Sequence, residues 1–221
     1  MQELDEQQER FVASNITFYN NMEISQFKKF ANLIGLDQGE DIDEIYDEIS
    51  KADRVLELGS GYGRVIEVLR RKGFKGVISG VERSLKLREY VQNTFNEDVR
   101  LFKELPLELN EKFDAILYVW SGILEQERDI QKDIVKQCAE LLDEGGKLLI
   151  ETPFKEIKKL GDLKEDTKTI RVKEEWGTLS AYFTSAQDIE EYAKEAGFKN
   201  IREVYYHTRT NLSRIFYILQ K

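Results

Sequence analysis

The chain has few of the residues that cross-link a fold or interrupt regular structure. Its 221 residues include one cysteine, Cys138, and two prolines, Pro106 and Pro153. A single cysteine excludes an internal disulfide and favours a reducing compartment. No apolar run approaches the roughly 18 residues of a membrane span, and the polar, acidic start does not resemble a signal peptide. We therefore expect a cytoplasmic protein with no membrane partner.

Basic residues are outnumbered by acidic ones. The chain has 33 Lys and Arg against 42 Asp and Glu, for a formal net charge of −9 and a pI near 5.0. Proteins that wrap a phosphate backbone usually carry a basic face, because cation release drives that binding. We therefore do not expect nucleic acid as the main partner. Hydrophobic residues make up 41% of the chain, enough for one sizeable core with an appended helical segment.

Residues 1–50 have helical periodicity. Apolar residues in 24–36 recur at three- and four-residue spacing, which predicts one buried helix face. In 41–49 the residues expected to point inward are Ile42, Ile45, Tyr46 and Ile49. The acids of that segment are Asp41, Asp43, Glu44, Asp47 and Glu48. We expect these acids on a solvated helix face, favourably near the helix start, rather than at a cation site.

From residue 54 the pattern changes to alternating strands and helices. Strands are expected at 54–58, 76–82, 99–102, 113–120, 145–153, 201–208 and 213–220, and helices at 63–73, 84–95, 127–142 and 184–198. A mixed-charge stretch, 155–175, precedes the last helix. Continuous apolar strands with helices between them predict an α/β fold, a parallel sheet covered on both faces.

The stretch "GSGYG", Gly59–Gly63, stands between the first strand and its helix. Ligands of open parallel sheets bind beyond the carboxyl ends of the strands, where small loop residues let backbone amides approach an anionic group. A dinucleotide fingerprint, G-x-G-x-x-G/A, would need a small residue where Arg64 stands. This disfavours an NAD-dependent oxidoreductase, although the loop position itself suits any nucleotide-like ligand.

Glu82 ends the second strand, 21 residues beyond Gly61. An acid at this distance can accept hydrogen bonds from both hydroxyls of a ribose. It would serve NAD and S-adenosylmethionine equally, so it supports nucleoside binding without choosing between them.

Four segments together resemble the class I S-adenosylmethionine-dependent methyltransferases. They are "ELGSGYG" from Glu57, the apolar strand "FDAILYVW", the turn "LLDEGG" and the helix end "YAKEAGF" before two final strands. The resemblance covers about residues 50–221. It implies a three-layer sandwich whose seven-stranded, mostly parallel sheet has an antiparallel last strand. It also implies an N-terminal helical cap, 1–50, and an S-adenosylmethionine-binding domain, 51–221.

The same resemblance implies S-adenosylmethionine as the cofactor and a set of binding residues. These are Glu57, Gly59, Ser60, Gly61, Tyr62, Gly63, Glu82, Arg83, Glu104, Leu105, Trp120 and Ser121. The glycine loop and Glu57 would hold the amino-acid end of the cofactor, and Glu82 the ribose. The short loop at Glu104 and Leu105 would border the adenine. Trp120 and Ser121 would line the methyl-donor side.

The methyl acceptor is expected to be a small molecule. His207, the single histidine, is the candidate general base. The family usually builds its acceptor pocket from the N-terminal helices and the 155–183 region, which here contain Phe11, Phe18, Tyr19, Tyr182 and Phe183. The alternatives are a protein- or RNA-directed methyltransferase and a protein that binds S-adenosylmethionine without turnover. No metal-ligand spacing occurs in the sequence.

Overall fold

The computed structural model describes residues 2–95, 99–108, 111–154, 162–164 and 168–221. Its main sheet has seven strands in the order β3-β2-β1-β4-β5-β10-β9. Their bounds are β1 Arg54–Leu58, β2 Val77–Val81, β3 Val99–Phe102, β4 Phe113–Tyr118, β5 Leu142–Pro153, β9 Asn200–His207 and β10 Ser213–Gln220. β10 pairs antiparallel with β5 and β9, and the remaining pairs of this sheet are parallel. The predicted sheet, with its antiparallel last strand, is confirmed.

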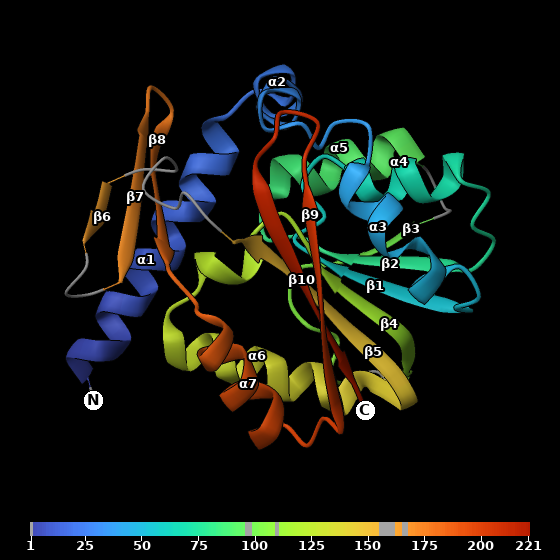
Figure 1. Cartoon of the computed structure of the whole chain (residues 1–221). Helices are drawn as coiled ribbons and strands as arrows, with labels where there is room; N and C mark the ends of the chain where they lie inside the picture. Colours follow the sequence, from blue (N-terminus) through green and yellow to red (C-terminus); the bar gives the residue numbers. More distant parts are fainter. Residues whose placement is uncertain (1, 96–98, 109–110, 155–161, 165–167) are drawn as a thin grey trace.

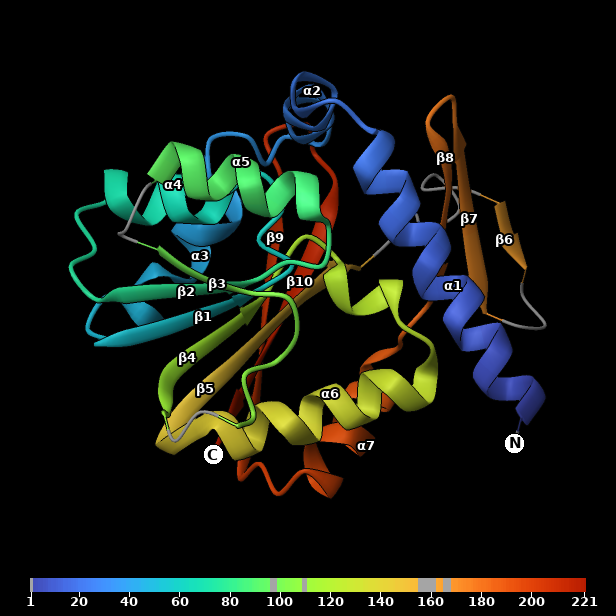
Figure 2. The ribbon, with the colours of Figure 1, turned by 180° about the vertical axis from the view of Figure 1, so that it is seen from behind.

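Helices cover both faces of the main sheet. The bounds of the covering helices are α3 Glu40–Ile49, α4 Arg64–Arg71, α5 Leu85–Phe95, α6 Arg128–Leu141 and α7 Ala186–Glu195. On β1, Val55 packs into the core beneath α3, α4 and α5, whereas Leu56 and Leu58 pack into the core above α6 and α7. The two views in Figures 1 and 2 show the same three layers. The predicted three-layer sandwich is therefore confirmed.

Two further helices precede α3, namely α1 (Gln2–Asn21) and α2 (Ile24–Ile34). α2 begins with a capping box between Glu23 and Gln26, and it ends at Gly35 in the left-handed conformation. α3 buries Ile42, Ile45 and Ile49 completely against the main sheet, as its periodicity predicts. The division of the chain at residue 50 stays a prediction.

A second sheet, in the order β6-β7-β8, lies beside α1 (Figures 1 and 2). Its strands are β6 Asp162–Lys164, β7 Thr169–Glu174 and β8 Gly177–Tyr182. The sequence pattern did not predict these strands, because β8 is partly exposed throughout and β7 has one buried residue and three charged ones. Ser14 of α1 donates to the carbonyl oxygen of Thr178 (2.9 Å), and Asn15 both donates to and accepts from the backbone of Ser180. Residues 155–161 and 165–167 lie outside the described part of the chain.

Element ends differ little from the predicted ones. β5 begins at Leu142, three residues before the predicted start at Gly145, because α6 passes directly into it. Ser185 caps α7 through a capping box with Asp188. Among the described helices, none is both long and apolar enough to cross a membrane.

Candidate active site

The glycine loop connects β1 to α4 and is tied to the end of β2. The amides of Gly59 and Ser60 both donate to the carbonyl oxygen of Val81, at 2.8 and 3.0 Å. Gly59, Gly61 and Gly63 have φ angles of 76°, 54° and 84°, a region that L side chains rarely adopt. A Cβ atom on Gly61 would lie 3.2 Å from the Phe27 ring, whereas one on Gly59 would meet nothing within 4 Å. The glycines therefore meet a backbone requirement, and open space adjoins Gly59.

Glu82 lies against this loop. Its Oε2 accepts from the amide of Gly61 (2.8 Å) and its Oε1 from the amide of Ser84 (2.7 Å). Burial raises the pKa of the Glu82 carboxyl above its usual range, and these two amides oppose the shift. The acid predicted to bind a ribose thus also fixes the loop to the start of α5.

Glu57 carries an unsatisfied atom at the carboxyl end of β1. The side chain is 2% exposed, and its Oε2 has no hydrogen-bond partner among the described residues. Burial raises the pKa of Glu57 well above its usual range, and the nearby Arg64 partly opposes this. Buried polar atoms in proteins are usually paired, so a lone carboxylate oxygen suits a ligand that donates hydrogen bonds. The α-ammonium group of S-adenosylmethionine is such a donor, and Glu57 beside the open space at Gly59 fits it.

Arg64 and Asp41 form a buried ion pair next to Glu57. The Arg64 Nη1 lies 2.7 Å from Asp41 Oδ1 and the Nη2 lies 2.6 Å from Oδ2, while Nη1 also donates to the carbonyl oxygen of Leu36. Asp41 is 0% exposed, so the prediction that it lies on a solvated face is wrong. Helical periodicity could not show that an arginine 23 residues later would reach it.

The chain leaves β4 through a strained turn. Trp120 and Ser121 have φ angles of 51° and 62°, and the short 3₁₀ helix η2 (Gly122–Glu125) follows. The Ser121 Oγ accepts from Nη2 of Arg214 (2.7 Å), and Arg214 forms a buried ion pair with Glu151. Two adjacent left-handed residues cost free energy and persist where their surroundings hold them, typically at functional sites. The two predicted donor-side residues are thus fixed at the carboxyl edge of the sheet.

Four aromatic side chains, which we call the aromatic wall, meet beside the glycine loop. They are Tyr19 of α1, Phe27 of α2, Tyr62 of the loop and Trp120 after β4. The Phe27 ring centre lies 5.4 Å from that of Tyr19, 5.2 Å from Tyr62 and 5.1 Å from Trp120. Phe27 of α2 therefore contacts two of the predicted cofactor-binding residues directly, and α1 packs against Phe27 through Tyr19.

Glu125, at the end of η2, was not among the predicted site residues. The Tyr19 hydroxyl donates to its carboxylate, and Arg83 donates to the adjacent Gln126 at 3.1 Å. Burial raises the pKa of Glu125 to about 7; the Tyr19 hydrogen bond opposes this shift and the charge on Glu82 adds to it. The sequence does contain a signal for Glu125, because it is an acid a few residues beyond an apolar strand. Residues in such positions gather at the carboxyl edge of a parallel sheet.

Three more of the predicted site residues lie in the loop after β3 and at the end of β9. Glu104 is exposed and Leu105 half-buried in the loop after β3, where Leu105 packs against the core. His207 is exposed at the end of β9, with its Nε2 3.3 Å from Ser213 Oγ. β4, β5 and β10 lie between β9 and β1, so at about 4.8 Å per strand His207 is roughly 19 Å across the sheet from the glycine loop. The structure does not bring His207 together with the other predicted residues.

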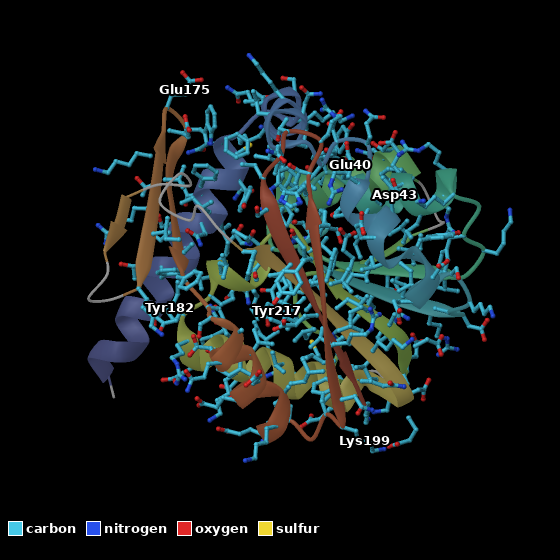
Figure 3. The ribbon with its side chains drawn as sticks, viewed as in Figure 1. Glu40, Asp43, Glu175, Tyr182, Lys199 and Tyr217 are labelled. Carbon is cyan, nitrogen blue, oxygen red and sulfur yellow. The ribbon has the colours of Figure 1, made fainter. Side chains whose placement is uncertain are left out.

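A cavity of about 280 Å³ lies between α1, the small sheet and the start of α6. Its lining residues are Phe11, Glu127, Arg128, Asp129, Thr169, Arg171, Ser180 and Tyr182. Phe11 and Tyr182 are two of the five aromatics predicted near the acceptor, and Figure 3 shows Tyr182 beside α1. In the described ranges no group of three or more His, Cys, Asp or Glu residues could hold a metal ion.

Comparisons with known proteins agree with this geometry. A methyltransferase domain family model matches residues 26–203. No curated protein matches the chain by sequence. Among solved structures, an S-adenosylmethionine-dependent methyltransferase from Clostridium acetobutylicum is 20% identical, with a TM-score of 0.64 over 88% of this chain and 98% of that one.

Two other solved structures are similarly close. An amino pentose methyltransferase from Micromonospora echinaspora is 16% identical, with a TM-score of 0.61 over 90% of this chain and 98% of that one. The 1,6-didemethyltoxoflavin N1-methyltransferase from Burkholderia thailandensis is 13% identical, with a TM-score of 0.60 over 86% and 80%. These likenesses support the fold, and the family model covers most of the chain. The chain belongs to the methyltransferase domain family, and it is an S-adenosylmethionine-dependent methyltransferase of class I, as its sequence predicts.

Proposed function

We propose that this methyltransferase acts on a small molecule that enters between the carboxyl edge of the main sheet and the N-terminal helices. The observation that carries the proposal is the aromatic wall, because it packs α2 on the glycine loop and α1 on α2. A covered site suits a small acceptor, whereas a protein or RNA substrate needs an open groove. In this proposal residues 1–50 act as the cap of the domain formed by 51–221.

The cofactor would be held by residues that the structure gathers at the carboxyl edge of β1 and β2. Glu57 offers an unpaired buried oxygen, and Gly59 has open space beside it. Glu82 retains lone pairs for ribose hydroxyls in addition to its two amide contacts. Trp120 and Ser121 would border the donor methyl, with Glu104 and Leu105 beside the adenine. S-adenosylmethionine supplies an electrophilic methyl group, and a dry, preorganised site favours its displacement.

Two of the solved structures of similar fold are named for small-molecule acceptors, an amino pentose and 1,6-didemethyltoxoflavin. The formal net charge of −9 also disfavours a nucleic-acid substrate. Together these points favour a small acceptor over a protein or RNA.

A thermal-shift panel tests the cofactor site. S-adenosylmethionine, S-adenosylhomocysteine, NAD and NADP are each added to the full chain and to Gly61→Val. A ligand at a hundred times its Kd stabilises by about 2.7 kcal/mol, and each kcal/mol raises Tm by roughly 2–4 °C at this size. We expect S-adenosylhomocysteine to raise the Tm of the wild type only, and NAD to have no effect. A rise with NAD alone would contradict the proposal.

A second experiment tests whether the methyl acceptor is a small molecule, a protein or an RNA. Tritiated S-adenosylmethionine is incubated with the protein and either total protein, total RNA or a deproteinised metabolite pool. Label in the metabolite fraction supports the proposal. Label in protein or RNA would overturn the small-molecule assignment, and binding without any transfer would identify a non-catalytic binder.

A further inference from the structure

Glu125 ends η2, which follows β4, and it contacts the first of the N-terminal helices. Its carboxylate accepts from Tyr19 of α1, and its backbone oxygen accepts from Asn15 of the same helix at 3.3 Å. Tyr19 in turn packs against Phe27, which lies over Gly61. Two aromatic rings, those of Tyr19 and Phe27, therefore connect Glu125 to the loop that would hold the cofactor.

Charges of both signs act on Glu125. The charge on Glu82, after β2, raises the pKa of Glu125. The hydrogen bond from Tyr19 and the charge on Arg83 lower it. Tyr118 of β4 also interacts electrostatically with Glu125 and remains neutral, because burial raises its pKa. Glu125 forms no ion pair among the described residues. A cationic ligand would give this carboxylate a directly paired positive charge.

We infer that Glu125 is the proton acceptor for a small amine substrate, and that Tyr19 holds it in place. The inference rests on the proposed function, since it concerns the acceptor side of the same site. It replaces His207 as the candidate base, because His207 lies on the outer strand of the sheet and is exposed.

The proposed chemistry balances in two steps. An alkylammonium enters and pairs with the Glu125 carboxylate, which takes one proton from its nitrogen. The freed nitrogen lone pair forms the N–CH₃ bond as the C–S bond breaks, and the bonding electrons stay on sulfur. The product is a methylated ammonium, and Glu125 returns its proton to water after release.

Two properties of the site favour an amine over a hydroxyl. A carboxyl with a pKa of about 7 can take a proton from an alkylammonium, whose pKa is about 10.4 in lysine. It is a far weaker match for a hydroxyl near the value of about 15.7 for water. The aromatic wall also favours cations, which are attracted to the faces of Trp, Tyr and Phe rings.

The test compares the wild type with Glu125→Gln and with Glu140→Gln, an exposed control on α6. Glutamine can still accept the Tyr19 hydrogen bond, so the contact between α1 and η2 survives while the base is lost. S-adenosylhomocysteine affinity is measured first by calorimetry and should agree within about twofold among the three proteins. Failure of the wild type to bind would refute the proposed function itself, which is a separate outcome.

Transfer is then measured with S-adenosyl-[methyl-²H₃]methionine and a defined library of amines, alcohols, phenols and thiols, read by mass spectrometry. We expect label on amine nitrogen, a rate at least about 100-fold lower in Glu125→Gln and an unchanged rate in Glu140→Gln. Tyr19→Phe should move the acidic limb of the pH–rate profile to higher pH, because it removes a hydrogen bond that favours the carboxylate. A purely structural Tyr19 would leave that limb in place.

Three results would overturn the inference. They are label found only on oxygen, sulfur or carbon, full turnover by Glu125→Gln, and no labelled product from a protein that binds S-adenosylhomocysteine. Carboxyl ¹³C NMR gives a readout that needs no acceptor, since the Glu125 signal is identified by its absence in Glu125→Gln. A titration midpoint near 7 supports the inference, and one near the usual value for glutamate contradicts it.

Discussion

Arg64 and Asp41 form a two-point ion pair that is closed to solvent on both sides. Their oxygen–nitrogen distances are 2.6 and 2.7 Å, and the residues are 4% and 0% exposed. The pair joins the helix that follows the glycine loop to α3, and the Arg64 guanidinium also lies 5.5 Å above the Trp120 ring. Arg64 therefore links three parts of the site that are distant in the sequence.

Removing one partner of this pair should destabilise the fold strongly. Asp41→Ala leaves a buried, uncompensated guanidinium, which costs about 3–5 kcal/mol. The free energy of unfolding, measured by urea titration, should fall by that amount. The control is Glu111→Ala, which breaks the exposed Arg100–Glu111 pair and should cost less than about 1 kcal/mol. Equal losses in the two variants would contradict the buried role.

Gly61→Val should abolish cofactor binding without unfolding the chain. Valine at a φ of 54° is strained, and its Cβ would press on Phe27 at 3.2 Å. The matched control is Gly197→Val, since Gly197 has a φ of 82° with no atom within 4 Å of a Cβ. Both variants carry comparable backbone strain. Circular dichroism should show that both remain folded. Calorimetry should show S-adenosylhomocysteine binding only in Gly197→Val, and binding by both would refute the loop assignment.

Glu82→Ala should weaken S-adenosylhomocysteine binding by about 1–3 kcal/mol, the range for lost hydrogen bonds to a charged group. It also leaves the amides of Gly61 and Ser84 without their carboxylate, so the Tm of the free protein should fall. Affinity is measured by calorimetry, with Glu89→Ala, exposed on α5, as control. A lower Tm with unchanged affinity would mean that Glu82 only fixes the loop.

The raised pKa of Glu125 predicts a pH-dependent stability difference. The folded state holds the proton more tightly than the unfolded state, so stability declines as pH rises from about 4.5 to about 7. Glu125→Gln does not titrate there, so its unfolding free energy relative to wild type should rise by about 3 kcal/mol across that window. Urea midpoints at four pH values, with Glu140→Gln as control, measure this. Parallel curves for wild type and Glu125→Gln would contradict it.

Local patterns in the sequence predicted the fold, and they also predicted the glycine loop and Glu82 as site residues. The apolar strands and their helices, the glycine spacing and Glu82 at the end of β2 all follow from short-range signals, and the structure places them at one edge of the sheet. The sequence also predicts His207 as the base, because a lone histidine suits proton transfer at neutral pH. Its strand proved to be the outer one, and strand order is not a local property.

By itself, the sequence determined the class of fold, the family and the position of the glycine loop, because each depends on residues close together in the chain. Only the tertiary structure decided which distant side chains meet there. It buried Asp41 against Arg64, brought Tyr19 to Glu125 across 106 positions and laid Phe27 over Gly61. Such contacts depend on how helices and strands pack against one another, and a periodic pattern records only which face of each element is buried.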